Sequence, residues 1–113
     1  MAINMKQLAS GTITNAVATY YTAASAVKAR IDAFTVTNYS GSAATVTIWL
    51  VPTGGTAGDT NIIVKARSIA AGASGRILEA IGQTLEGGGT IQMQASANSA
   101  ITIAVSGIEQ TAV

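Results

Sequence analysis

The sequence predicts an all-β protein: an antiparallel β-sandwich of six to eight short strands, with a jelly-roll or an immunoglobulin-like topology. Two observations predict it, because polar and apolar residues alternate in several segments and turn-forming residues recur about every ten positions. A third agrees with them, since Pro52 ends the most regular segment and interrupts none. The 113 residues leave room for one β-sandwich domain, 1–113.

The N-terminal part carries the weakest pattern. Residues 1–16 are expected to form an irregular, extended arm that becomes ordered on contact with a neighbouring chain. A first strand is expected at 17–23, where Val17, Tyr20 and Tyr21 stand among threonine and alanine.

The next two strands are predicted to form an antiparallel hairpin. Residues 30–38 are one candidate strand, and Tyr-Ser-Gly-Ser at 39–42 has turn chemistry. The clearest period of two runs through 43–51, where Ala44, Val46, Ile48 and Leu50 share one face and Thr45, Thr47, Trp49 and Val51 share the other.

The middle of the chain adds one edge strand and one ambiguous segment. Residues 60–69 alternate, and Lys65 and Arg67 on one face indicate an edge or a solvent side. Residues 76–86 are predicted as a strand followed by a tight turn, with a single helical turn as the alternative, because helical spacing there meets Gly82.

A second hairpin is predicted near the C-terminus. Residues 90–97 alternate, Asn98 and Ser99 provide a short turn, and alternation resumes through 101–105.

Charge is unusually scarce. Six Lys or Arg and five Asp or Glu give 10% charged residues and a net charge of +1, whereas a typical domain has about 25% charged residues. Proteins near zero net charge tend to associate. The core is also expected to be thin, since alanine supplies much of the apolar fraction. We therefore expect a homo-oligomer whose surface is covered by other subunits.

The composition offers little for catalysis or metal binding, and we predict no catalytic residue, no cofactor-binding residue and no metal ligand. Histidine is absent, which removes the usual base that activates a nucleophile. Cysteine is absent as well, which excludes thiolate metal ligands and disulfides. The carboxylates are dispersed, and Asp32 is expected to pair with Arg30 or another cation. The glycine clusters at 54–58 and 87–89 lack a P-loop or dinucleotide fingerprint and are interpreted as turns.

Nucleic acid and membranes are not expected as partners. Direct phosphate binding requires several clustered cations, and this chain has only small groups such as Lys65 with Arg67. No run of about 18 apolar residues occurs and the N-terminus is unlike a secretory signal, so synthesis in a cytoplasm is expected. The sequon Asn38-Tyr39-Ser40 is interpreted as accidental.

Several segments resemble small structural proteins of tailed bacteriophages. They are TVTIWLVPTGG at 45–55, Asn61, ARSIAAG at 66–72, LEGG at 85–88 and ANSAITIAVSGIE at 97–109. The resemblance covers 31–109, although Gly-Gly-Gly at 87–89 departs from the Gly-Asp turn of such sequences. It implies a β-sandwich component of a virion, assembled in the bacterial host cytoplasm and present in many copies.

We accordingly expect a non-enzymatic bacteriophage virion protein, a capsid decoration (cement) or head accessory protein that binds capsid subunits. The alternative is a neck, tail or tail-fibre component, including a glycan-binding host-recognition module that would use an exposed Trp49 or tyrosine. The predicted contact residues are Tyr20, Tyr21, Thr45, Thr47 and Trp49.

Overall fold

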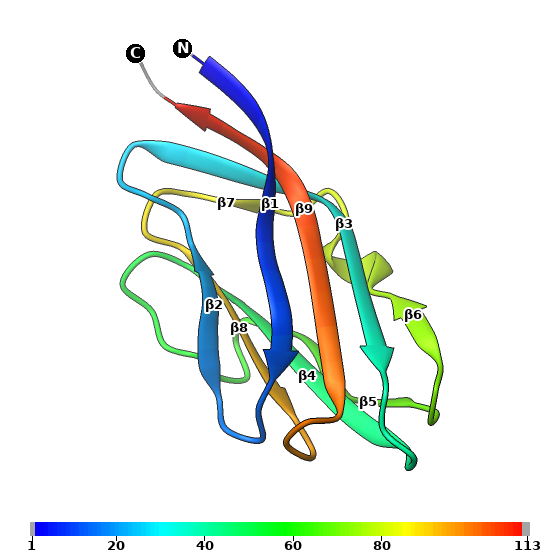
Figure 1. Ribbon diagram of the computed structural model, residues 1–113. Helices are drawn as coiled ribbons and strands as arrows, with labels where there is room; N and C mark the ends of the chain where they lie inside the picture. Colours follow the sequence, from blue (N-terminus) through cyan, green and yellow to red (C-terminus); the bar gives the residue numbers. More distant parts are fainter. Residues whose placement is uncertain (1, 112–113) are drawn as a thin grey trace.

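The computed structural model describes residues 2–111, which form two antiparallel sheets packed face to face (Figure 1). The first sheet has the order β1-β9-β3-β6, and β7 pairs with β3 on the same side as β6. The second has the order β2-β8-β4-β5. The strands are β1 (Ala2–Ile13), β2 (Ala18–Thr22), β3 (Val27–Asn38), β4 (Ala44–Val51), β5 (Ile62–Ile69), β6 (Ser74–Arg76), β7 (Thr84–Leu85), β8 (Thr90–Ala95) and β9 (Ile101–Thr111). The predicted all-β sandwich is confirmed.

The order in which the chain visits the sheets is that of a jelly roll. The chain crosses from one sheet to the other after β1, β2, β3, β5, β7 and β8, whereas β4 and β5 are neighbours within one sheet. Two antiparallel sheets connected in this way, here with the short strands β6 and β7 together in the fourth position of the five-stranded first sheet, are the arrangement of a jelly roll. Of the two topologies expected from the sequence, the structure has this one.

Both predicted hairpins are wrong, although their strands exist. β3 and β4 lie in different sheets, and so do β8 and β9. Each connection is therefore an arch across the sandwich. The physical reason is that an alternating strand buries its apolar side chains equally well beside a neighbour or opposite one. Phe34 of β3 and Ile48 of β4 accordingly belong to one core between the sheets.

The predicted irregular arm at 1–16 is also wrong over most of its length. Ala2–Ile13 form β1, which pairs with β9 from Ala2 opposite Thr111 to Ile13 opposite Ile101. A register shift between Gln7 and Ala9 and a positive φ of 122° at Gly11 accommodate the irregular sequence within the strand. Met1 lies outside the described residues.

The ambiguous segment 76–86 contains a helical turn, so the alternative interpretation is correct. β6 ends at Arg76, a single 3₁₀ turn spans Leu78–Ala80, and β7 follows at Thr84–Leu85. Ile77 and Ala80 are buried, and Gly82 with φ 84° reverses the chain after the turn. The apparent helical spacing therefore reflects one turn that buries two side chains.

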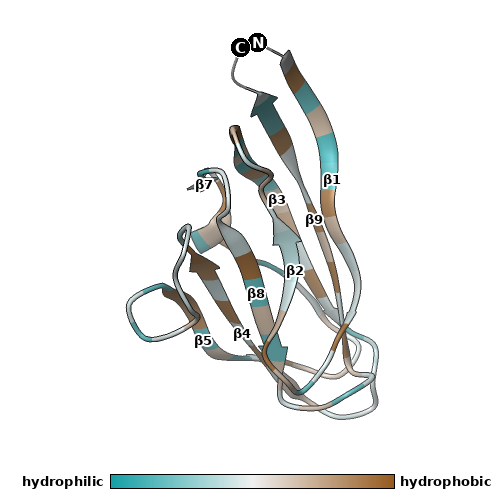
Figure 2. Cartoon of the chain, turned by 90° about the vertical axis from the view of Figure 1, so that its left-hand side faces the viewer, coloured by the Kyte–Doolittle hydropathy of each residue, from teal (hydrophilic) through white to brown (hydrophobic). Residues whose placement is uncertain are grey.

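The core lies between the sheets, and Figure 2 shows apolar and polar bands alternating along β8. The predicted alternation of β4 is confirmed as far as Ile48, since Ala44, Val46 and Ile48 are buried. It fails after Ile48, because a register shift follows that residue, so that Val51 is buried and Leu50 is only half-buried. The largest fully buried side chains are Phe34, Ile13, Ile31, Ile48, Ile77, Ile91, Met93, Ile101, Ile103, Val36, Val46 and Val51. Branched aliphatic residues supply most of this core.

The loop at 87–89 has a defined conformation. The Gly88 backbone N–H donates to the Ala23 carbonyl at 2.7 Å, and the Ala23 N–H donates to the Gly89 carbonyl at 2.9 Å. Gly88 has a φ of 90°, which favours glycine. These bonds tie the loop to the chain just after β2, in agreement with its interpretation as a turn between strands.

Candidate functional site

The five predicted contact residues do not form one surface. Tyr21 is buried in the core, and Trp49 is only 9% exposed. Tyr20 is half-buried, and its hydroxyl accepts a hydrogen bond of 3.2 Å from the Thr14 N–H. Thr45 and Thr47 are half-buried on the outer face of β4. Within the single chain, burial therefore leaves Thr45 and Thr47 easier for a partner to reach than Tyr21 and Trp49.

The two threonines line a shallow polar pocket of about 310 Å³ together with Asn15, Gln94, Ala95 and Ser96. Each also has a structural task. The Thr47 hydroxyl accepts the Ala66 N–H at 3.0 Å, where β5 bulges with φ 48° at Ala66. The Thr45 N–H donates to the Ser96 hydroxyl at 2.9 Å.

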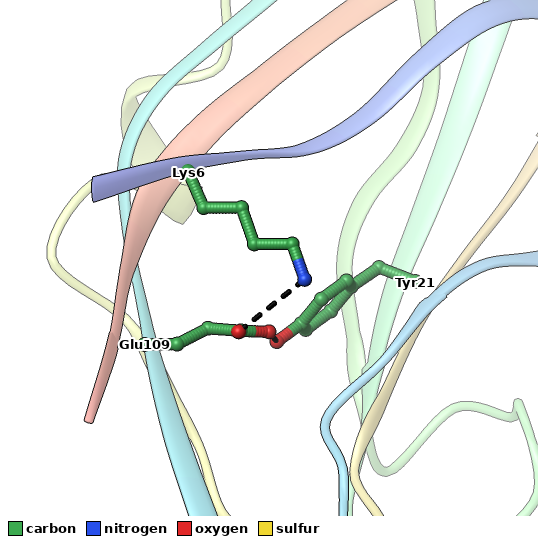
Figure 3. Close-up of polar contacts among 3 residues, drawn as sticks. All are labelled: Lys6, Tyr21 and Glu109. Carbon is green, nitrogen blue, oxygen red and sulfur yellow. Dashed lines mark hydrogen bonds and ion pairs between the residues drawn. The ribbon is translucent and has the colours of Figure 1, made fainter. Parts of the chain in front are cut away.

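A polar cluster connects the two sheets near one end of the sandwich (Figure 3). The Tyr21 hydroxyl of β2 donates a hydrogen bond to the Glu109 carboxylate of β9, and Lys6 of β1 lies 3.3 Å from the same carboxylate. Burial, followed by the bond to Glu109, raises the pKa of the Tyr21 hydroxyl above its ordinary value. The cluster therefore holds a neutral tyrosine against a carboxylate that Lys6 balances.

The other ion pairs lie on the surface. Arg30 and Asp32 are 2.9 Å apart, which confirms the expected pairing of Asp32. Lys28 pairs with Glu86, and Arg67 of β5 pairs with Glu79 of the 3₁₀ turn. The hydrogen bond from Arg67 lowers the pKa of Glu79. Within residues 2–111, no three side chains of the types His, Cys, Asp or Glu gather as a metal site would require.

Asn38 at the end of β3 is fully buried. Its amide donates to the carbonyls of Ser42 at 2.8 Å and Ile69 at 2.9 Å, and its oxygen accepts the N–H and the hydroxyl of Ser40. The side chain that a sequon would modify is thus inaccessible in the folded chain. The residue instead fixes the arch between β3 and β4.

Within residues 2–111, the longest strand at the end of a sheet is β1. This strand of 12 residues ends the first sheet, so half of its N–H and C=O groups point away from β9. Ile3 and Met5 are 62% and 90% exposed, and Figure 2 shows apolar and polar bands alternating along this end of β1. We call residues 3–6 of this strand the β1 edge. The irregular arm expected at 1–16 did not include this edge, although Ile3 and Met5 alternate with Asn4 and Lys6.

The remaining sheet ends are shorter or blunted. β2 has five residues, β6 three and β7 two. β5 has eight, but it carries Lys65, Arg67 and the bulge at Ala66, which are devices that discourage strand addition. Its placement as an edge strand confirms the prediction from Lys65 and Arg67.

A groove opens on the side of the sandwich opposite β1. It has a volume of about 400 Å³ and lies where the end of β4 and the start of β5 approach β7. The residues that line this groove, called the β5–β7 groove below, are Leu50, Pro52, Thr60, Asn61, Ile62, Ile63, Gln83, Thr84 and Leu85. None of them carries a charge.

Comparison with known proteins identifies the fold and not a family. No family model matches the chain, and no curated protein matches its sequence. Among solved structures, the chain is similar to one described as Bacillus endospore appendages that form a family of disulfide-linked pili. The identity is 19%, the match covers 98% of this chain and 89% of that chain, and the TM-score is 0.57.

This similarity corrects the functional expectation. A bacteriophage virion protein, either as a capsid decoration protein or as a neck, tail or tail-fibre component, is wrong, because the structural neighbour belongs to a bacterial pilus. Of the aromatic residues that the glycan-binding alternative would use, Trp49 and Tyr21 are buried, whereas Tyr39 is exposed. The residues that suggested a phage protein are strand and turn patterns, which unrelated β-sandwiches share. Within residues 2–111, no helix has the length and apolar character needed to cross a membrane.

Proposed function

We propose that this protein is a non-enzymatic structural subunit that assembles with copies of itself into a pilus-like filament. The observation that carries the proposal is the β1 edge, a long unpaired strand on which Ile3 and Met5 are exposed. An exposed, apolar edge strand readily pairs with another chain. In a subunit that assembles into a filament, pairing of this edge with another copy is the contact that the function requires.

The scarcity of charge supports the same role. Four of the five carboxylates pair with a cation of the same chain, and the net charge is +1. Copies of the protein therefore repel one another weakly. Burying a neutral or apolar contact surface also costs less hydration free energy than burying a charged one.

The similarity to an endospore pilus supports a filament, and the composition adds a difference. That pilus family is described as disulfide-linked, whereas this chain has no cysteine. Its copies would have to cohere through apolar burial and backbone hydrogen bonds. Assembly would thus be insensitive to reducing agents.

Absence of histidine and cysteine from the sequence supports the non-enzymatic part of the proposal. These residues supply most activated nucleophiles and general bases near neutral pH. The one perturbed tyrosine, Tyr21, is buried between the sheets and bonded to Glu109, which is a structural position.

Sedimentation velocity over a concentration series tests the proposal. We expect species much heavier than the 11.3 kDa chain, which increase with protein concentration and persist when a reducing agent is added. A single boundary at the mass of one chain, at every concentration, would refute it.

A further inference from the structure

The β1 edge and the β5–β7 groove are complementary surfaces on opposite sides of one molecule. We infer that the β1 edge of one copy docks in the β5–β7 groove of a second copy, so that the chains join head to tail. This inference rests on the proposed function and names the two surfaces that the assembly uses.

The β1 edge has the chemistry of an inserting strand. Ile3 and Met5 lie two residues apart, so both side chains project from the same face of β1. Between and beside them are Asn4 and Lys6, and Lys6 is already paired with Glu109 of its own chain. The strand therefore presents two apolar side chains with no unbalanced charge nearby.

The β5–β7 groove has a lining suited to binding aliphatic side chains. Leu50, Ile62, Ile63 and Leu85 supply apolar lining, and the remaining lining residues are neutral. Apolar grooves with neutral rims favour aliphatic side chains over charged ones, since a charge would lose its hydration on entry.

Backbone groups at the groove are also available. β5 pairs with β4 alone and β7 pairs with β3 alone, so each has an outer edge that a strand can join. The devices that blunt β5, which are Lys65, Arg67 and the bulge at Ala66, lie beyond the groove. The segment 60–63 that lines the groove, which comprises the start of β5 and the two residues before it, lacks them.

The positions of the surfaces determine the kind of assembly. β1 is at one end of its sheet, whereas β7 lies beyond β3 at the other end, and β5 ends the second sheet on that same side. Figure 2 shows β1 and β5 on opposite sides of the molecule. A contact between two different surfaces of identical chains is heterologous, and it repeats into a filament or closes into a ring. Each copy supplies both surfaces, which makes a second copy the occupant.

Two charged double variants test the contributions of the two surfaces separately. The edge variant combines Ile3→Glu with Met5→Glu, and the groove variant combines Thr60→Glu with Thr84→Glu. All four positions are exposed in the single chain, so the fold should tolerate the changes. Tyr39→Glu is the matched control, because Tyr39 is 52% exposed and belongs to neither surface.

We expect each double variant to remain monomeric at concentrations about tenfold or more above those at which the wild type and Tyr39→Glu assemble. A mixture of the two should give a two-chain complex, because the intact edge of the groove variant fits the intact groove of the edge variant. Sedimentation velocity of each variant and of the mixture measures both effects. Circular dichroism confirms folding, and serine replaces glutamate at any position where the variant fails to fold.

Other outcomes overturn the inference. If the groove variant assembles like the wild type while the edge variant does not, two β1 strands pair with each other instead. If both variants assemble, or if their mixture stays monomeric, the edge and the groove are not partners. In all these cases the wild type still assembles, whereas a monomeric wild type would refute the proposed function itself.

Discussion

Tyr21 of β2 donates a hydrogen bond to the Glu109 carboxylate of β9, and this bond joins the two sheets close to the β1 edge. Lys6 of β1 completes the cluster (Figure 3). Since β1 is an edge strand, its position depends on such contacts as well as on the ladder to β9.

The variant Tyr21→Phe should lower the free energy of unfolding by about 1–3 kcal/mol, because it removes a hydrogen bond to a charged group and leaves Glu109 short of a donor. Urea unfolding followed by circular dichroism measures the change. Tyr39→Phe, at an exposed position, is the control and should change stability by less than about 0.5 kcal/mol. Equal losses in both variants would show that the bond to Glu109 contributes nothing.

Stability should decline in alkaline solution because the pKa of Tyr21 is higher in the folded chain than in the unfolded one. Below the ordinary tyrosine pKa of 10.0, both states keep the proton and this contribution is complete. Above it, the unfolded chain ionises first, so stability falls with pH by up to about 1.4 kcal/mol per unit. Unfolding measured at about pH 9 and pH 11 should show this fall in the wild type and a smaller one in Tyr21→Phe. Parallel pH profiles would contradict the prediction.

The variant Asn38→Asp should cost about 3 kcal/mol or more, although the two side chains have nearly the same shape. A carboxylate cannot donate to the Ser42 and Ile69 carbonyls, so both bonds would be lost, and the bond to Ile69 lies in a buried site. The Ser42 carbonyl would keep only the bond from the Ser40 hydroxyl. Thermal and urea unfolding measure the loss. Ser40→Ala removes only the hydroxyl contacts and should cost about 1 kcal/mol. A loss in Asn38→Asp no larger than that in Ser40→Ala would exclude this role for the amide.

The variant Gly107→Ala should destabilise the protein by about 3 kcal/mol or more. A Cβ atom at Gly107 would lie 1.9 Å from the Arg30 carbonyl oxygen, which belongs to the backbone of the neighbouring β3 and cannot rotate away. Gly41→Ala is the control, since a Cβ there meets nothing within 4 Å. Comparable melting temperatures for the two variants would show that β9 and β3 separate easily at this position.

The positions of the strands could be predicted from the sequence more accurately than the pairing between them. Alternation identified β4 and β5 almost residue by residue, because alternation directly reports one-sided burial. It could not distinguish a neighbour in the same sheet from a strand in the opposite sheet, so two arches were interpreted as hairpins. Asn38, whose buried amide fixes one arch, was assigned from the sequence only to the end of the candidate strand 30–38 and to an accidental sequon.

The surfaces proposed for assembly could not be predicted from the sequence, for a related reason. β1 is held by β9, whose residues are about a hundred positions away along the chain, and no local pattern reports such a pairing. The β5–β7 groove combines residues from three separate segments, 50–52, 60–63 and 83–85, and only the fold brings these together. Conversely, Tyr21 and Trp49 attracted attention as large aromatic residues and are buried within the chain.

Electron microscopy of the purified protein, with no second protein present, tests the claim of self-assembly most directly. The account predicts filaments or rings in which one jelly-roll unit repeats, at low and high salt and with or without a reducing agent. Ordered particles that form only after a second protein is added, or no ordered assembly at any concentration, would contradict it.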